Sequence, residues 1–181
     1  MSRPPISEYE WYRLAAPSGR DQLWVQIEAR EKPHPGPWML PDGTDVVDAI
    51  ARGKVFDLPF DVWLQQSPSC RGRHAADMLW TGGLRYLVMS AELAAVLQAE
   101  AQGVRAFVLP LRLRGGETTD RYRVLVPDMD GRGPVCSEVI GHPSDRINVR
   151  GTVLKALQAA GVNGFVWESG QAPAPPLPWT E

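Results

Sequence analysis

The sequence predicts an α+β fold, in which two or three helices pack against a mainly antiparallel sheet. Helices are indicated by Ala- and Leu-rich stretches at 91–102 and 152–160, each of which ends at a glycine. Strands are indicated at 105–114 and 121–126, where two apolar segments flank a Gly-containing turn, as in a β-hairpin. A chain of 181 residues that is 44% hydrophobic can bury a core without a disulfide or a metal.

The first third of the chain is expected to begin with two short strands, at 9–14 and 23–27, around a turn. Aromatic and β-branched side chains favour strands there. Residues 32–41 contain four prolines and predict an extended loop, because proline lacks the amide hydrogen that a helix interior needs. A short helix is expected at 45–52, followed by a strand within 55–64.

Capping residues mark the helix ends. Thr44 or Asp45 is expected to cap the first helix, and the Ser90 hydroxyl can satisfy a free amide in the first turn of the second. The glycines that follow the three predicted helices are Gly53, Gly103 and Gly161. Further strands are expected at 84–89, 135–140 and 164–168.

We expect one domain over residues 1–171 and a proline-rich tail at 172–181; the alternative division has a small N-terminal lobe at 1–64. The chain also repeats a short pattern, Gly-Val-x-x-Phe-Val, at 103–108 and 161–166. In both places a helix ends and a strand begins. The repeat indicates either a duplicated unit or convergence on a common helix-to-strand connection.

Four arginines are predicted on one outer face of the hairpin. Side chains alternate across a strand, so Phe107, Leu109, Leu111 and Leu113 should face the core. The arginines on the opposite face are Arg112, Arg114, Arg121 and Arg123. They form either a solvated surface, relieved by Glu117 and Asp120, or a docking face for an acidic partner. The net charge of −2 disfavours nucleic acid as the partner.

A second candidate contact surface is the acidic segment, residues 42–61. The carboxylates at its start are Asp42, Asp45 and Asp48, and they are opposed by Arg52 and Lys54. Just before them, Trp38 lies between Pro37 and Met39 in the predicted loop. An exposed tryptophan is a common interface anchor, so Trp38 is expected either to contact a partner or to pack back on its own domain.

Two pairs of residues resemble zinc ligands. The pairs are Cys70 with His74 and Cys136 with His142. The alternative is two ordinary cysteines and two loop histidines, because the spacings are loose and about sixty residues separate the pairs; we expect no cofactor. A small enzyme that uses His74 or His142 is a further alternative, although the usual hydrolase and nucleotide-binding motifs are missing.

Nothing in the sequence indicates a membrane. The start of the chain lacks the apolar run of a signal peptide, and no stretch of about 18 apolar residues occurs. Two cysteines do not make a disulfide scaffold. We therefore expect a cytoplasmic protein that does not bind a membrane.

Several segments between residues 77 and 168 follow one another in a characteristic order. They are Asp77-Met-Leu-Trp80, Tyr86-Leu-Val-Met-Ser-Ala-Glu-Leu93, Phe107-Val-Leu-Pro-Leu111, Asp120-Arg-Tyr-Arg-Val-Leu-Val126 and Ala160-Gly-Val-Asn-Gly-Phe165. This progression resembles a myxobacterial-type immunity-protein family of bacterial polymorphic toxin systems. The resemblance implies a non-enzymatic protein that binds a cognate toxin domain and neutralises it by stoichiometric occlusion. The alternatives are the small enzyme and a zinc-stapled binding domain.

Overall fold

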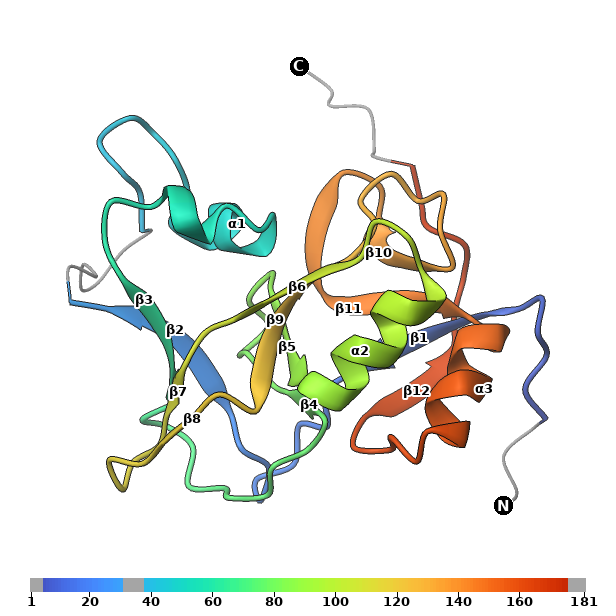
Figure 1. Cartoon of the computed structure of the whole chain (residues 1–181), viewed down its shortest axis with the longest axis horizontal. Coiled ribbons are helices and arrows are strands. Elements are labelled where there is room, and N and C mark those ends of the chain that lie inside the picture. The colour runs from blue at the N-terminus through green and yellow to red at the C-terminus, as the bar shows by residue number, and fades with distance from the viewer. Residues whose placement is uncertain (1–4, 31–37, 176–181) are drawn as a thin grey trace.

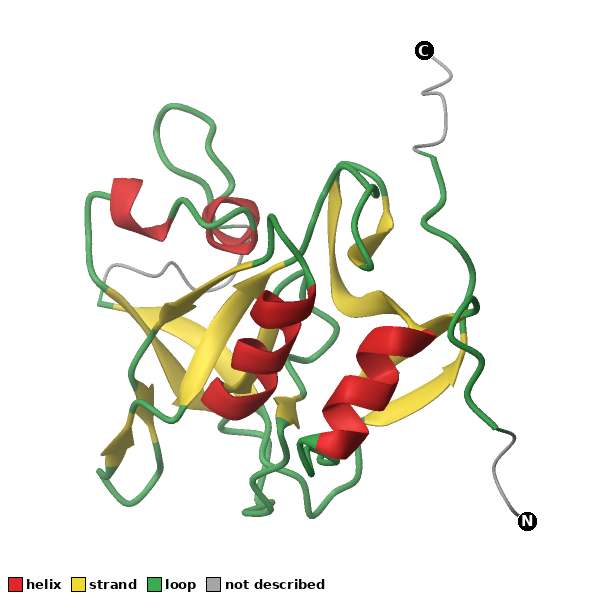
Figure 2. Ribbon diagram, turned by 45° about the vertical axis from the view of Figure 1, so that its right-hand side comes forward, coloured by secondary structure: helices red, strands yellow, loops and turns green. Residues whose placement is uncertain are grey.

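Three four-stranded sheets, mostly antiparallel, and three α-helices form residues 5–30 and 38–175, the part of the chain that the computed structural model describes (Figures 1 and 2). This arrangement confirms the predicted α+β class. Residues 31–37 and 176–181, which include most of the predicted proline-rich loop and tail, lie outside the described part.

The first sheet joins the beginning of the chain to its end. Its order is β10-β11-β1-β12, and all neighbouring strands are antiparallel. The strands are β1 (Trp11–Ala15), β10 (Val135–Val139), β11 (His142–Arg150) and β12 (Val166–Ser169). The sequence did not predict β11, because Ile147 and Val149 are the only large aliphatic residues among its nine.

The second sheet has the order β2-β3-β7-β8, with β3 and β7 parallel and the other pairs antiparallel. Its strands are β2 (Val25–Ala29), β3 (Val62–Gln66), β7 (Leu111–Arg112) and β8 (Thr118–Thr119). The strands β1 and β2, predicted around the first turn, therefore belong to different sheets. The described part of residues 1–64 contributes to both.

The third sheet lies between two apolar cores. Its order is β4-β5-β9-β6, and the strands are β4 (Met78–Leu79), β5 (Leu87–Ser90), β9 (Tyr122–Val126) and β6 (Arg105–Val108). Side chains alternate across a strand, so Leu87 and Met89 enter one core while Tyr86 and Val88 enter the other. One core also holds residues of the first sheet, and the other holds residues of the second sheet.

The helices cover the sheets at three places. Their bounds are α1 (Val46–Ala51), α2 (Ala91–Glu100) and α3 (Gly151–Ala159). The predicted caps are confirmed for two of them: the Asp45 carboxylate accepts the amides of Val47 and Asp48, and the Ser90 hydroxyl accepts that of Leu93. Helices α2 and α3 lie side by side in Figure 1 and share one core. Within the described residues, none of the helices is long and apolar enough to cross a bilayer.

The strand predicted at 105–114 is broken in two. After β6 the chain passes Leu109 and Pro110 and continues as β7, which pairs in the second sheet instead of the third. Proline lacks an amide hydrogen, so it cannot continue the ladder with β9. The hairpin turn is confirmed further on, where β7 pairs with β8. Residues 55–64, within which a strand was expected, begin with a 3₁₀ turn, η1 (Val55–Asp57), and the strand β3 starts only at Val62.

The repeated sequence pattern has a counterpart in the topology. Strands β5 and β6 are both antiparallel to β9, which separates them, and α2 connects them. Strands β11 and β12 are likewise both antiparallel to β1, and α3 connects them. The glycines after the two helices, Gly103 and Gly161, have φ values of 90° and 75°, which L side chains rarely adopt. Both repeats are thus split β-α-β units, in which a third strand separates the two connected strands.

Asp77 ties the two units together. Its carboxylate accepts the Ser90 hydroxyl at 2.9 Å, just before α2, and the Gly164 amide at 2.8 Å, just before β12. Its backbone carbonyl also accepts the Ser90 amide at 2.7 Å. A side chain at Gly164 would clash with the backbone of Asp77, so glycine is needed for this close approach.

Candidate functional site

A cavity of about 660 Å³ opens between the β7–β8 hairpin and the loop that follows β3. Four arginines line it, together with a single carboxylate, that of Glu117. We call this cavity the arginine groove, after Arg71, Arg73, Arg114 and Arg121. Its other lining residues include three leucines, Leu23, Leu111 and Leu113. The groove therefore combines an excess of positive charge with apolar surface.

The loop wall of the groove carries Arg71 and Arg73. The burial of residues 71–73 alternates as in an extended chain, with Gly72 buried between the two exposed arginines. The segment is tied to residues 21–23 by two backbone hydrogen bonds, from Leu23 to the His74 carbonyl at 2.8 Å and from His74 to the Asp21 carbonyl at 2.9 Å. Residues two apart in an extended segment point the same way, which places both arginines on the groove. Gly72 between them lies so close to the backbone of residues 21–22 that a side chain there would clash.

The hairpin wall carries Arg114 and Arg121, which lie just after β7 and just before β9. Arg114 donates to the carbonyl oxygens of Ser67 and Pro68 in the opposite wall. A guanidinium nitrogen of Arg121 lies 4.0 Å from the Asp77 carboxylate. These two arginines are therefore held in place by the fold.

The loop arginines are not neutralised in the same way. Across residues 5–30 and 38–175, neither Arg71 nor Arg73 forms an ion pair with a carboxylate, and both side chains are exposed. Beside them, burial raises the pKa of the Tyr122 phenol above its ordinary value, and its hydroxyl donates to the Ala76 carbonyl at 3.1 Å. Arg71 and Arg73 thus have guanidinium donors available for an anionic ligand.

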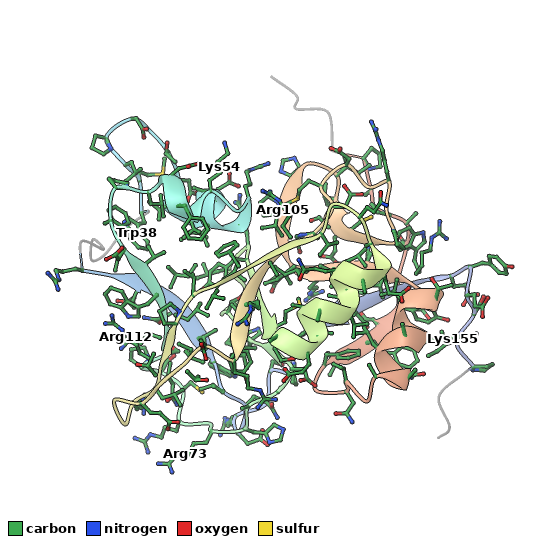
Figure 3. The ribbon with its side chains drawn as sticks, in the orientation of Figure 1. Trp38, Lys54, Arg73, Arg105, Arg112 and Lys155 are labelled. Carbon is green, nitrogen blue, oxygen red and sulfur yellow. The ribbon has the colours of Figure 1, made fainter. Side chains whose placement is uncertain are left out.

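The prediction of a single face with four arginines is wrong. Arg114 and Arg121 meet at the groove, but the Arg112 Cζ lies over the Trp63 ring, 3.9 Å from its centroid, and Figure 3 shows Arg112 apart from Arg73. Arg123 is half-buried and donates to the Asp120 and Tyr122 carbonyls. The face is divided because the chain changes sheets at Pro110 and again before β9, so the alternation of one strand does not extend over the whole hairpin.

All three carboxylates at the start of the acidic segment are used within it. Asp45 caps α1, and Asp48 pairs with Arg52 at 2.7 Å. The Thr44 amide donates to Asp42 at 2.9 Å, and this bond, with a second from the Thr44 side chain, lowers the pKa of Asp42. These groups do stay at the surface, but their first role is to hold the local fold.

The prediction of Trp38 as an exposed contact is wrong. Its side chain is 7% exposed and stacks on Phe60, with ring centroids 5.5 Å apart and planes 6° apart. Its carbonyl accepts the Val46 amide at the start of α1. The second alternative, packing on its own domain, holds because the ring belongs to the core under the acidic segment. The exposed aromatic of this segment is Phe56, at 82%.

The four cysteine and histidine residues do not form a metal site. Cys70 donates its thiol to the Gln22 carbonyl at 3.0 Å, and Cys136 donates to that of Gly133 at 2.9 Å. Burial raises the pKa of Cys136 to about 11, which keeps it a neutral thiol at pH 7. Among the residues with described positions, no three His, Cys, Asp or Glu side chains are grouped closely enough to hold a metal, so Cys70, His74, Cys136 and His142 do not form one ligand cluster.

The sequence analysis missed Arg71 and Arg73. Their only local signal is an Arg-Gly-Arg triplet in a polar stretch, which does not indicate what lies opposite it. No protein-family model matches the chain, and no curated protein matches its sequence. The chemistry of the arginine groove is therefore the basis for assigning a function. Guanidinium groups around an apolar floor are suited to binding carboxylates or phosphates.

Proposed function

We propose that this protein is an immunity protein, which binds a cognate bacterial toxin domain and neutralises it by covering its active surface. The observation that carries the proposal is the arginine groove, where Arg71 and Arg73 are exposed without an ion pair among the described residues. The resemblance to immunity proteins over residues 77–168 supports it further. That region includes the hairpin wall of the groove.

Arginine suits such a contact for physical reasons. Its planar fork makes paired hydrogen bonds to carboxylates, and arginine is enriched in protein interfaces. The net charge of the chain is only −2, so the chain as a whole does not attract anions. The local excess of arginine instead gives a positive electrostatic potential at the groove itself. Such a field speeds the encounter with an acidic surface and disfavours other partners.

The groove is also preorganised. Backbone hydrogen bonds hold the loop wall, and the Arg114 side chain bridges the two walls. A surface that is already ordered loses little conformational entropy on binding, which favours high affinity. Inhibition by stoichiometric occlusion requires high affinity, because each inhibitor molecule must stay bound to its toxin.

Co-expression tests the proposal. We expect a gene beside this one to encode a large secreted protein. Its C-terminal domain should arrest growth when produced alone, and this chain should restore growth and form a 1:1 complex with it. Charge reversal in the double variant R71E/R73E should weaken the complex by roughly 100-fold or more, because like charges would then face each other.

The matched control is R85E/R132E, which makes the same charge change at two exposed arginines outside the groove. It should protect cells as the original protein does. Failure of the original chain to restore growth or to bind would refute the proposed function. Equal weakening by both double variants would remove the groove from the contact.

A further inference from the structure

We infer that the arginine groove binds an extended peptide segment with carboxylates on alternate residues. This inference rests on the proposed function, in which the segment belongs to the toxin domain. It identifies the ligand by chemistry: a strand-like stretch in which every second side chain is Asp or Glu. Three features lead to this choice: the spacing of the loop arginines, the apolar part of the groove lining and the unpaired edge of β8.

The first feature is the spacing of the loop arginines. Exposed Arg71 and Arg73 lie on either side of buried Gly72, the alternation typical of an extended chain, in which Cα atoms two residues apart are separated by about 6.6 Å. An extended ligand running beside them has the same repeat. Carboxylates on its alternate residues therefore meet one guanidinium each. Adjacent carboxylates would point to opposite sides, and only one of them could be paired.

The second feature is the composition of the lining. Leu23, Leu111 and Leu113 contribute apolar surface, against which the methylene groups of a peptide can pack. A free phosphate would gain nothing from that surface. The thirteen residues that line the groove come from strands and loops, and none comes from the first turn of a helix, where phosphate groups are commonly bound. The lining thus favours a peptide carboxylate over a phosphate.

The third feature is the free edge beside the groove. The order β2-β3-β7-β8 leaves β8 with a strand on one side only, and Glu117 and Thr119 of this hairpin line the groove. An extended segment can add to such an edge through backbone hydrogen bonds, while its side chains reach nearby pockets. The negative charge of Glu117 is then the one element that opposes an acidic ligand, and it limits where the carboxylates can lie.

Peptide binding to the full chain tests this inference. The probe is a fluorescein-labelled peptide of alternating Thr and Glu, titrated with protein at low ionic strength and followed by anisotropy. Changing Arg71→Gln and Arg73→Gln together should weaken binding about tenfold, the loss expected for two solvent-exposed ion pairs. The R85Q/R132Q control, at exposed sites outside the groove, should bind as the unmodified protein does.

Two further peptides test the ligand chemistry. A Gln-for-Glu version should lose binding to the same extent as the R71Q/R73Q variant. A version with the same composition but adjacent glutamates should bind more weakly than the alternating one. Equal binding of all three peptides would overturn the inference. A Glu117→Gln variant should strengthen binding of the alternating peptide, because one repulsive charge is removed.

Other anions define the remaining outcomes. Pyrophosphate and a short single-stranded oligonucleotide are titrated as competitors, and displacement by either at lower concentration than the alternating peptide would overturn the inference in favour of a phosphate ligand. Both proposals can fail separately. If the protein protects growth but does not bind the peptide, the peptide-ligand inference is refuted and the immunity function stands. If it binds the peptide but does not protect growth, the immunity function is refuted and the peptide-ligand inference stands. Matching melting temperatures show that the variants are folded.

Discussion

The arginine groove and the acidic segment each concentrate one charge, but they use it differently. In the acidic segment Asp45 caps a helix and Asp48 pairs with Arg52, so these carboxylates are occupied by their own neighbours. In the groove Arg71 and Arg73 have no such carboxylate among the described residues. Charge density alone therefore does not distinguish a binding surface from a structural one.

The difference has an energetic basis. A carboxylate that accepts amides at a helix start stabilises the fold, and a partner that drew it away would lose that contribution. A guanidinium with free donors loses only water when a ligand arrives. The groove is held together by backbone bonds and by Arg114 and Arg121, so its loop arginines contribute little to folding. Substitutions should therefore separate the two regions by their effect on stability.

The largest effect is expected under the acidic segment. Trp38→Ala should lower the free energy of unfolding by about 3–5 kcal/mol, because it removes a large buried ring that stacks on Phe60. Urea denaturation measures the change. Phe56→Ala is the control, since that ring is 82% exposed and its loss should cost only about 0.5 kcal/mol. Similar losses for both variants would mean that Trp38 is not a core residue.

A smaller effect is expected at the helix cap. Asp45→Ala should cost about 1 kcal/mol of unfolding free energy, because two amides at the start of α1 lose their acceptor. Asp45→Ser should recover most of this loss, since a hydroxyl can also accept. Asp57→Ala removes the same charge from an exposed position nearby and should be almost neutral. If Asp57→Ala costs as much, the effect comes from charge and not from capping.

Residues that begin and end helices explain why much of the fold could be predicted. Asp45 and Ser90 are good N-caps, and Gly103 and Gly161 follow helices with positive φ, so these boundaries are encoded within a few residues. Pairing between strands is not encoded in this way. The change of sheet at Pro110 depends on which strand lies beside β7, and that partner, β3, is far away in the sequence.

The candidate site could be predicted only in part, for the same reason. Arg114 and Arg121 were among the predicted contact residues, because they flank a turn that the sequence marks clearly, although the face predicted for them was wrong. Arg71 and Arg73 come from a polar, turn-rich stretch without apolar alternation. They reach the groove because that stretch is tied to residues 21–23, about fifty positions earlier. A single sequence contains no signal for such a contact.

The smallest effect is expected at Asp42. Hydrogen bonds from Thr44 hold the pKa of this exposed carboxyl below its ordinary 3.8, so Asp42 should titrate below that value in an NMR pH titration. A depressed pKa in the folded state adds stability above the unfolded-state pKa, and the contribution is lost as pH falls through the folded-state pKa. Thr44→Ala should raise the pKa only partly, because the backbone bond remains. A measured Asp42 pKa at or above 3.8 would show that this carboxylate, like the loop arginines of the groove, is not held by hydrogen bonds within the fold. The acidic segment would then again qualify as a contact surface.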